Sequence, residues 1–154
     1  MISEKHPPSQ TFMHRISATI AIGFFIFILW IIYLANTGGK SIFFDFVRSF
    51  PYGDKVGHAG LFGFLTLVAV IGSKFRCFKI SKFKIYHGAT WVILFVVGEE
   101  ISQTFIPSRT FDLMDLAADM VGIAVATCLA FGGSLYFTKS SRMDQENVAV
   151  QPDQ

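Results

Sequence analysis

Residues 85–106, IYHGATWVILFVVGEEISQTFI, decide the fold of this chain. The first fourteen of these residues contain no Asp, Glu, Lys or Arg, but a helix needs about 20 mostly apolar residues to cross the core of a bilayer. The segment reaches that length only if Glu99, Glu100 and Gln103 lie inside the helix. We predict that they do, because an isolated apolar run of fourteen residues would be a poor span.

Three further runs without Asp, Glu, Lys or Arg are long enough to cross a bilayer. They cover residues 16–39, 56–73 and 120–138. Together the four runs predict an all-α integral membrane protein, a bundle of four transmembrane helices. We place the helices at about residues 16–35, 56–73, 85–106 and 115–137. Residues 16–34 could instead be a secretory signal, although signal cores usually run only about 7 to 15 residues.

The composition points the same way. Of the 154 residues, 52% are apolar and only 16% are charged, with a mean hydropathy of +0.50, whereas about a quarter of the residues in soluble domains are charged. The net charge of +2 gives no case for a nucleic-acid partner. Cys77 and Cys128 have no CxxC spacing, so neither a disulfide framework nor a zinc knuckle is supported.

The basic residues predict the orientation of the helices, because cytoplasmic loops carry the excess of Lys and Arg. The connection between the second and third helices has no acid and five basic residues, Lys74, Arg76, Lys79, Lys82 and Lys84. If this loop is cytoplasmic, four spans place both termini in the cytoplasm, with nine basic residues inside and four outside. Residues 1–138 then form the membrane domain, and the polar residues 139–154 form a disordered cytoplasmic tail.

A short segment between the first two helices is amphipathic. Within residues 41–50, the apolar side chains of Phe43, Phe46, Val47 and Phe50 repeat at helical spacing. We predict that this segment lies flat on the outer interface of the bilayer, with its apolar face towards the acyl chains.

The predicted topology gathers unusual polar residues at the outer face, where the second helix begins, the third ends and the fourth begins. Spacings of three or four residues put the members of each set on one helix face. Each ionisable group costs about 2.5 to 3.5 kcal/mol in a membrane unless it is paired or hydrated. We therefore predict a compact ligand-binding cluster of Asp54, Lys55, His58, Glu100, Gln103, Arg109, Asp112, Asp115 and Asp119.

These residues resemble the VanZ-like family of bacterial membrane proteins. The motifs are Asp54-Lys55-x-x-His58, Glu100-x-x-Gln103, Pro107-x-Arg109, Asp112-x-x-Asp115 and Gly122. The likeness covers about residues 16–138, and residues 100–122 are its most specific part. It implies a multi-pass protein of the bacterial inner membrane, linked to resistance to teicoplanin and related glycopeptides. Ser108 in place of the usual glycine and Asp119 in place of asparagine depart from the pattern, and Asp119 alters the charge balance of the site.

Structural roles compete with functional ones at several of these positions. Asp54 and Asp112 each precede a predicted helix start and could cap it. Arg109 could form a buried ion pair with Glu100 or Asp115 that locks three helices together. His58 titrates near neutral pH, and Asp54, one turn away, could fix its tautomer.

The predicted site suits an anion. Two helices present their positive ends to the outer face, and Lys55, His58 and Arg109 add to that field, so a phosphate or carboxylate fits. The nearby candidates are an anionic lipid of the bilayer and a lipid-linked wall precursor. The acids of the same patch oppose that field, and a divalent cation such as magnesium, calcium or manganese would reconcile the two. In a metal-assisted hydrolase, Asp112 and Asp115 would hold the metal and Arg109 would hold the phosphate.

Three functions remain open. The first is a non-catalytic protein that binds an anionic envelope lipid or wall precursor and so lowers access of glycopeptides. The second is a metal-assisted or acid-base lipid phosphate hydrolase, with His58 or Glu100 as base. The third is a proton or ion pathway. We rank them in this order, because no nucleophile elbow, zincin motif or P-loop is present.

Overall fold

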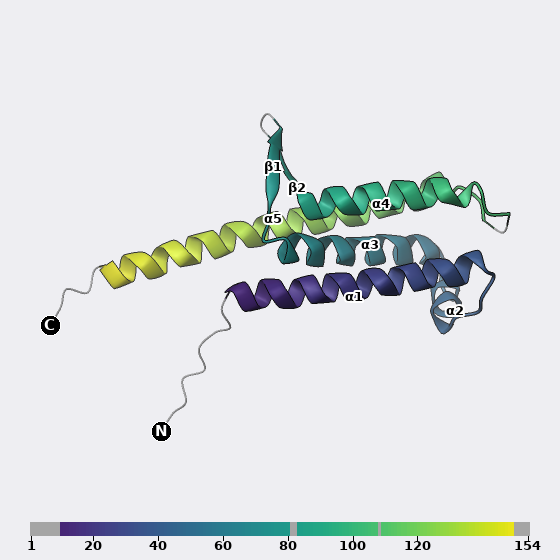
Figure 1. Cartoon of the computed structure of the whole chain (residues 1–154), viewed down its shortest axis with the longest axis horizontal. Helices are drawn as coiled ribbons and strands as arrows, with labels where there is room; N and C mark the ends of the chain where they lie inside the picture. Colours follow the sequence, from purple (N-terminus) through teal and green to yellow (C-terminus); the bar gives the residue numbers. More distant parts are fainter. Residues whose placement is uncertain (1–9, 81–82, 108, 150–154) are drawn as a thin grey trace, which may run out of the picture.

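The computed structural model describes residues 10–80, 83–107 and 109–149, with side chains for residues 12–79, 84–107 and 109–135. It is mostly helical. The elements are α1 (Gln10–Asn36), α2 (Ile42–Arg48), α3 (Gly53–Gly72), β1 (Cys77–Ile80), β2 (Phe83–Tyr86), α4 (His87–Gln103) and α5 (Leu113–Ala149). The four long helices run side by side, and α3 lies centrally in contact with α1, α4 and α5 (Figure 1).

Within the described residues, three helices are long and apolar enough to cross a membrane. They are α1 over Phe12–Asn36, α3 over Gly53–Gly72 and α5 over Leu113–Leu135. The predicted span at residues 85–106 is shorter in the structure: α4 has 17 residues. At about 1.5 Å per residue it is roughly 25 Å long, slightly less than a hydrocarbon core of about 30 Å.

The two ends of α4 explain the difference. Tyr86 and the residue before it pair with β1, so the helix begins only at His87. Beyond Gln103 the chain tightens into turns in which each amide N–H bonds the carbonyl three residues back, as from Ile106 to Gln103 at 3.0 Å. Pro107 then disfavours further helix at the residue before it.

Small residues bring α3 and α5 into close contact. A Cβ atom at Gly122 would overlap the backbone carbonyl of Ala59, and one at Gly63 would lie 3.0 Å from the carbonyl oxygen of Gly122. Glycine at both positions therefore lets the two backbones approach, as is common between helices in membranes. This crossing turns the Asp115 and Asp119 side of α5 towards α3.

One face of α4 is buried and the opposite face is exposed. Val92, Val96, Glu100 and Gln103 lie on the buried face, so the two polar residues continue an apolar stripe. Their shared face agrees with the spacing of three residues in the sequence. On the opposite face the side chain of Trp91 is 71% exposed.

The short helix α2 confirms the helical spacing of the segment between α1 and α3. Ser41 precedes it, and its hydroxyl accepts a hydrogen bond from the backbone N–H of Phe43 at 3.2 Å. Gly53 is needed next to it, because a Cβ atom there would overlap the backbone carbonyl of Val47. The contact holds α2 across the first turns of α3. Its location at a bilayer interface stays a prediction.

Two features depart from the predicted all-α bundle. A hairpin forms between α3 and α4, because Phe78-Lys79 and Lys84-Ile85 alternate apolar and polar residues with the period of a strand. Helix α5 continues to Ala149, past the predicted end at residue 137 and into the tail predicted to be disordered. No Gly or Pro interrupts residues 134–149. Residues 150–154 of that tail lie outside the described residues.

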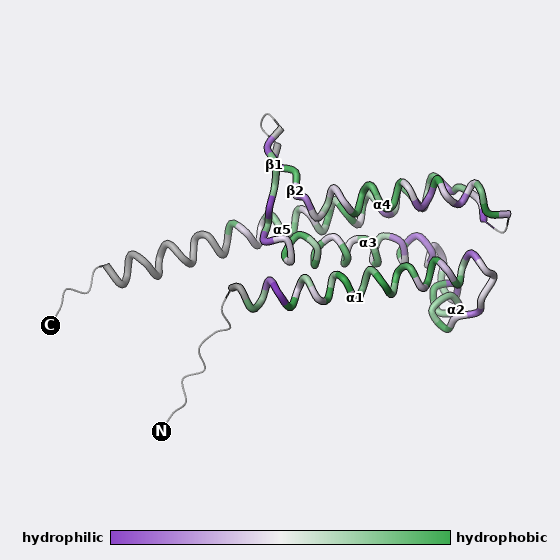
Figure 2. Tube along the Cα trace, viewed as in Figure 1, coloured by the Kyte–Doolittle hydropathy of each residue, from purple (hydrophilic) through white to green (hydrophobic). Residues whose placement is uncertain are grey.

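The two ends of the bundle differ. At the end that we call the polar end, α3 begins, α4 ends, α5 begins and α2 lies nearby (Figure 1). At the hairpin end, α1 begins, α3 ends and the hairpin stands away from the helices. The helices between them are largely hydrophobic, whereas the start of α3 and parts of the hairpin are hydrophilic (Figure 2).

Candidate functional site at the polar end

Lys55 is the centre of an ion-pair network between α3 and α5. Its Nζ lies 3.0 Å from Asp54, 2.7 Å from Asp112 and 2.5 Å from Asp115. The side chain of Asp115 is mostly buried, whereas that of Asp54 is 58% exposed. One ammonium group therefore joins the start of α3 to the start of α5 through three carboxylates.

His58 pairs with α5 rather than with its neighbour on α3. Its Nδ1 lies 3.1 Å from Oδ1 of Asp119, whose side chain is only 1% exposed. Its Nε2 lies 3.8 Å from Asp115, which is an ion-pair distance but too long for a hydrogen bond. The expectation that Asp54 orients His58 is wrong, because Asp54 contacts Lys55 and the close α3–α5 crossing brings Asp119 to the ring.

Glu100 connects the end of α4 to the start of α5. Its side chain is 1% exposed, and its Oε1 accepts a hydrogen bond from the backbone N–H of Asp112 at 2.7 Å. Gln103 donates to its Oε2 at 3.2 Å and to Glu99 at 2.9 Å. Glu100 thus holds the connection between the helices.

Asp112 caps α5, whereas Asp54 is not the N-cap residue of α3. The Oδ1 of Asp112 accepts a hydrogen bond from the backbone N–H of Met114 at 2.8 Å. The Lys55 ammonium on its other oxygen holds the pKa of Asp112 below the usual 3.8. Asp54 lies inside the first turn of α3, whose N-cap is Tyr52, because the helix starts earlier than residue 56.

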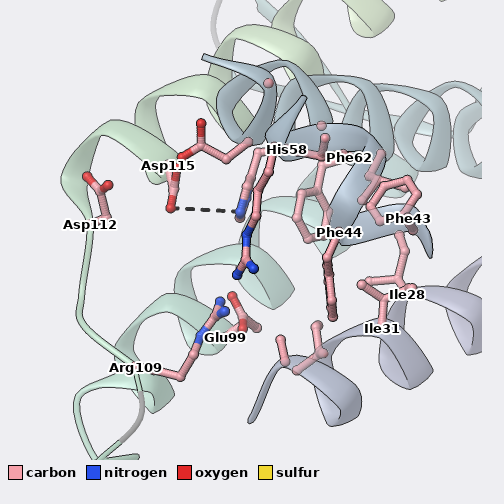
Figure 3. Close-up of a pocket in the computed structure, with 18 of the residues that line it drawn as sticks. Ile28, Ile31, Phe43, Phe44, His58, Phe62, Glu99, Arg109, Asp112 and Asp115 are labelled. Atoms are coloured by element: carbon pink, nitrogen blue, oxygen red, sulfur yellow. Dashed lines mark ion pairs between the residues drawn. The ribbon is translucent and has the colours of Figure 1, made fainter. Parts of the chain in front are cut away.

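A cavity of about 560 Å³ opens beside this network. Figure 3 shows Ile28 and Ile31 of α1 and Phe43 and Phe44 of α2 on one side, and His58, Asp115, Asp112 and Arg109 towards the other. Asp54, Glu99 and Gln103 also line it. Lys55, Glu100 and Asp119, which the sequence also predicts as site residues, are absent from the lining and act behind it. The cavity is therefore apolar on one side and charged on the other.

Two arginines line the cavity without a partner in the described part of the chain. Neither Arg109 nor Arg48 takes part in any of the ion pairs found there. The Nε of Arg109 is buried and has no hydrogen-bond partner. The predicted ion pair of Arg109 with Glu100 or Asp115 is not formed, since backbone N–H and Lys55 groups occupy those carboxylates.

Two charged residues that line the cavity, Arg48 and Glu99, were not among the site residues predicted from the sequence. Arg48 is at the end of α2, and Glu99 precedes the predicted Glu100. A basic residue in an otherwise aromatic segment was the available signal for Arg48, but only the fold of α2 against α3 brings it to the cavity. Ser108 lies outside the described residues.

The described carboxylates are not arranged to hold a metal ion. No group of three or more His, Cys, Asp and Glu side chains within residues 12–79, 84–107 and 109–135 converges suitably. The physical reason is visible at Lys55, whose ammonium occupies the centre of three carboxylates where a divalent cation would otherwise lie. Binding of a divalent cation at this place stays a prediction.

No family model, no curated protein and no solved structure matches the chain. The resemblance of its motifs to VanZ-like proteins stays a prediction, and the properties of the site rest on its own geometry.

Proposed function

We propose that this chain is a multi-pass protein of the bacterial inner membrane that binds an anionic lipid or lipid-linked wall precursor in the cavity at the polar end. α4 serves as a fourth, short span, both termini face the cytoplasm, and the polar end faces outward. The observation that carries the proposal is the cavity itself, which Arg48 and Arg109 line together with apolar side chains and without an ion-pair partner among the described residues.

The chemistry of the two sides supports an amphipathic ligand. Guanidinium groups bind phosphate with paired, charge-assisted hydrogen bonds. The acids of the cavity already have partners: the Lys55 ammonium contacts Asp54, Asp112 and Asp115, although its single charge offsets only one of them, and Gln103 donates to Glu99. The arginines are therefore the groups that gain most from an anion, while Ile28, Ile31 and Phe44 offer a surface to a hydrocarbon chain.

Exposed apolar side chains support the membrane setting of α1, α4 and α5. Leu94 on α4, Val121 and Leu129 on α5 and Ile26 on α1 are each more than half exposed. Large exposed apolar surfaces are unfavourable in water and normal against lipid. A local thinning of the bilayer or the turns after Gln103 would accommodate the short α4.

Binding of a polyprenyl phosphate tests the proposal. Purified protein in detergent should bind undecaprenyl phosphate and not undecaprenol, and the double variant Arg48→Gln, Arg109→Gln should weaken binding at least about tenfold. Lys40→Gln, an exposed position, is the matched control. Equal binding of the phosphate and the alcohol would overturn the proposal.

The link to glycopeptides rests on the resemblance to VanZ-like proteins. Expression of the chain should raise the teicoplanin concentration that inhibits growth, and the same double arginine variant should abolish the increase at equal protein levels. An unchanged inhibitory concentration would remove this part of the proposal and leave lipid binding standing.

A second function is favoured by the arrangement of His58. Asp119 holds its Nδ1, while Nε2 of this cavity-lining residue forms no hydrogen bond with the described residues, as in a general base oriented by a carboxylate. In a lipid phosphate hydrolase, Nε2 would take a proton from water as the water oxygen attacks phosphorus. The bond from phosphorus to the lipid oxygen would break, and that oxygen would take the proton back.

His58, rather than Glu100, is the base in this second proposal. The Glu100 carboxylate is buried and already accepts a hydrogen bond from the backbone N–H of Asp112. Purified protein should release inorganic phosphate from a polyprenyl phosphate, with and without added magnesium, and His58→Gln should stop the release. No phosphate above the His58→Gln background would remove the hydrolase.

A further inference from the structure

The hairpin end of the bundle carries basic side chains without acids. Every Asp and Glu whose side chain is described belongs to the polar end, and the sequence has no acid between Asp54 and Glu99. The described basic residues at the hairpin end are Arg15, Lys74, Arg76, Lys79 and Lys84. The side chains that the structure describes thus supply no negative group to neutralise them.

The register of the hairpin places two of these lysines together. Lys79 of β1 is paired directly with Lys84 of β2, and both are exposed. Like charges directly opposite one another destabilise a two-stranded sheet, and an anion between them would relieve the repulsion. Figure 1 shows the hairpin standing across the direction of the helices. If the helices cross a bilayer, the hairpin lies along its surface, at the level of the lipid head groups.

A second cavity runs from the hairpin end between α1, α3 and α4. Its volume is about 660 Å³. Ile22 and Phe25 of α1 and Trp91 of α4 line its apolar part, while Arg76 and His87 lie at its hairpin end. The rings of Phe25 and Phe95 meet with centroids 4.9 Å apart and close its inner part. The groove is thus apolar along the helices and basic at its mouth.

We propose that this groove binds an anionic phospholipid, with one acyl chain against Phe25 and Trp91 and the phosphate at Arg76 and His87. The Lys79–Lys84 pair adds positive charge beside the head group. The start of α4 contributes the positive end of its helix dipole at the same place. The site shares no lining residue with the cavity at the polar end, so it does not depend on the function proposed there.

The chemistry selects a phospholipid over other occupants. The apolar wall lies on helices that expose large hydrophobic side chains, so hydrocarbon is the medium available to it. Arg76 has no ion pair among the described residues, so its guanidinium can bind a phosphate with two hydrogen bonds. A neutral or zwitterionic lipid could fill the groove, but its head group has no net negative charge to offset the basic side chains at the mouth of the groove.

Trp91 provides a reporter inside the groove. The chain has two tryptophans, so Trp30→Phe leaves Trp91 as the single source of tryptophan fluorescence. The full chain, reconstituted in phosphatidylcholine vesicles, is titrated with phosphatidylglycerol carrying brominated acyl chains, which quench tryptophan on contact. Brominated phosphatidylcholine at the same bromine content is the parallel titration.

The expected result is half-maximal quenching at an about tenfold lower mole fraction of the anionic lipid than of brominated phosphatidylcholine. The double variant Arg76→Gln, His87→Gln should remove the difference. Arg76→Lys with His87 retained should keep part of it, and Lys40→Gln at the polar end should leave it unchanged. Equal quenching by the two lipids would overturn the proposal, since it is the behaviour of non-selective surrounding lipid.

Circular dichroism in the same vesicles separates loss of the fold from loss of the site. A variant that loses only the site keeps the helical spectrum of the parent and its quenching by phosphatidylcholine. A difference that survives in Arg76→Gln, His87→Gln would also overturn the proposal, because the selectivity would then come from other groups. Failure here leaves polyprenyl phosphate binding at the polar end unaffected.

Discussion

The two ends of the bundle hold their charges in opposite ways. At the polar end, acids and cations from different helices contact one another, as Lys55 does with Asp112 and Asp115 and His58 does with Asp119. At the hairpin end, Lys79 lies beside Lys84 and no described acid is near them. Charged side chains contact one another where the helices pack at the polar end, whereas those of the hairpin are available to a ligand.

The difference separates stability from binding. Charges that pair inside the bundle contribute to the free energy of unfolding, because removal of one partner leaves the other desolvated. Charges without partners contribute little to folding and are available to a ligand. Arg109 belongs with this second group although it lies at the polar end. The following substitutions test this division, from the largest expected effect to the smallest.

The largest effect is expected from His58→Leu. It leaves the carboxylate of Asp119 buried without its partner, which should lower the free energy of unfolding by about 3 kcal/mol. Reversible unfolding in mixed micelles measures it. The double variant His58→Leu, Asp119→Leu should recover most of the loss, because replacing both partners by apolar groups is nearly neutral. A double variant as unstable as the single one would contradict the pairing.

Lys55→Met should cost less. The three carboxylates around it lose their shared cation, but Asp54 is largely exposed and water replaces part of the interaction. We expect a loss of about 2 kcal/mol in the same unfolding experiment. Lys40→Met, at an exposed lysine, should stay within about 0.5 kcal/mol of the parent. Equal effects of the two substitutions would mean that the network contributes nothing to stability.

Acid should weaken the same network at Asp112. The hydrogen bond from Lys55 makes the pKa of this carboxyl lower in the folded chain than the usual 3.8. Its contribution is therefore complete above the unfolded value and is lost as the pH falls through the folded one. Since the side chain is 40% exposed, the loss should stay below about 1 kcal/mol.

Unfolding measured at about pH 5 and at about pH 3 shows this loss directly. Asp112→Asn should make the difference between the two pH values smaller, because the titrating carboxyl is gone. A difference that is unchanged in Asp112→Asn would assign the acid sensitivity to other groups.

The smallest effect on stability is expected from Arg109→Gln. The guanidinium has no ion-pair partner in the described part of the chain, so the free energy of unfolding should change by less than about 0.5 kcal/mol. Binding of undecaprenyl phosphate should fall in the same variant. A stability loss comparable with that of Lys55→Met would show that Arg109 holds helices together after all.

Much of the fold could be predicted from the pattern of apolar residues. Three long apolar runs are three helices able to cross a membrane, and the run at residues 85–106 forms α4 around Glu99 and Glu100. The hairpin was missed because its basic residues were interpreted only as a loop signal, although apolar and basic residues alternate in both strands. The observed helix ends differ from the predicted ones where capping and turn hydrogen bonds, rather than the length of the apolar run, determine where the helix stops.

The sequence predicted which residues form the site better than it predicted which of these residues contact one another. Spacing along one helix identifies a shared face, as for Glu100 and Gln103 or Asp115 and Asp119, because helical geometry is local. It does not say which helix lies opposite. His58 therefore contacts Asp119 instead of Asp54, and Arg48 joins the cavity from a segment that only the fold of α2 against α3 brings there.

Hydropathy and helical periodicity, which depend on neighbours in the chain, determined from the sequence alone that this protein is helical and has spans apolar enough for a bilayer. The tertiary structure decided which charges are neutralised and which are left open. Gly63 and Gly122 let α3 and α5 approach so closely that Lys55 reaches Asp112 and Asp115, and Arg109 has no ion-pair partner among the described residues. Ion pairing depends on distances of a few ångströms between distant residues, and only the packed helices set those distances.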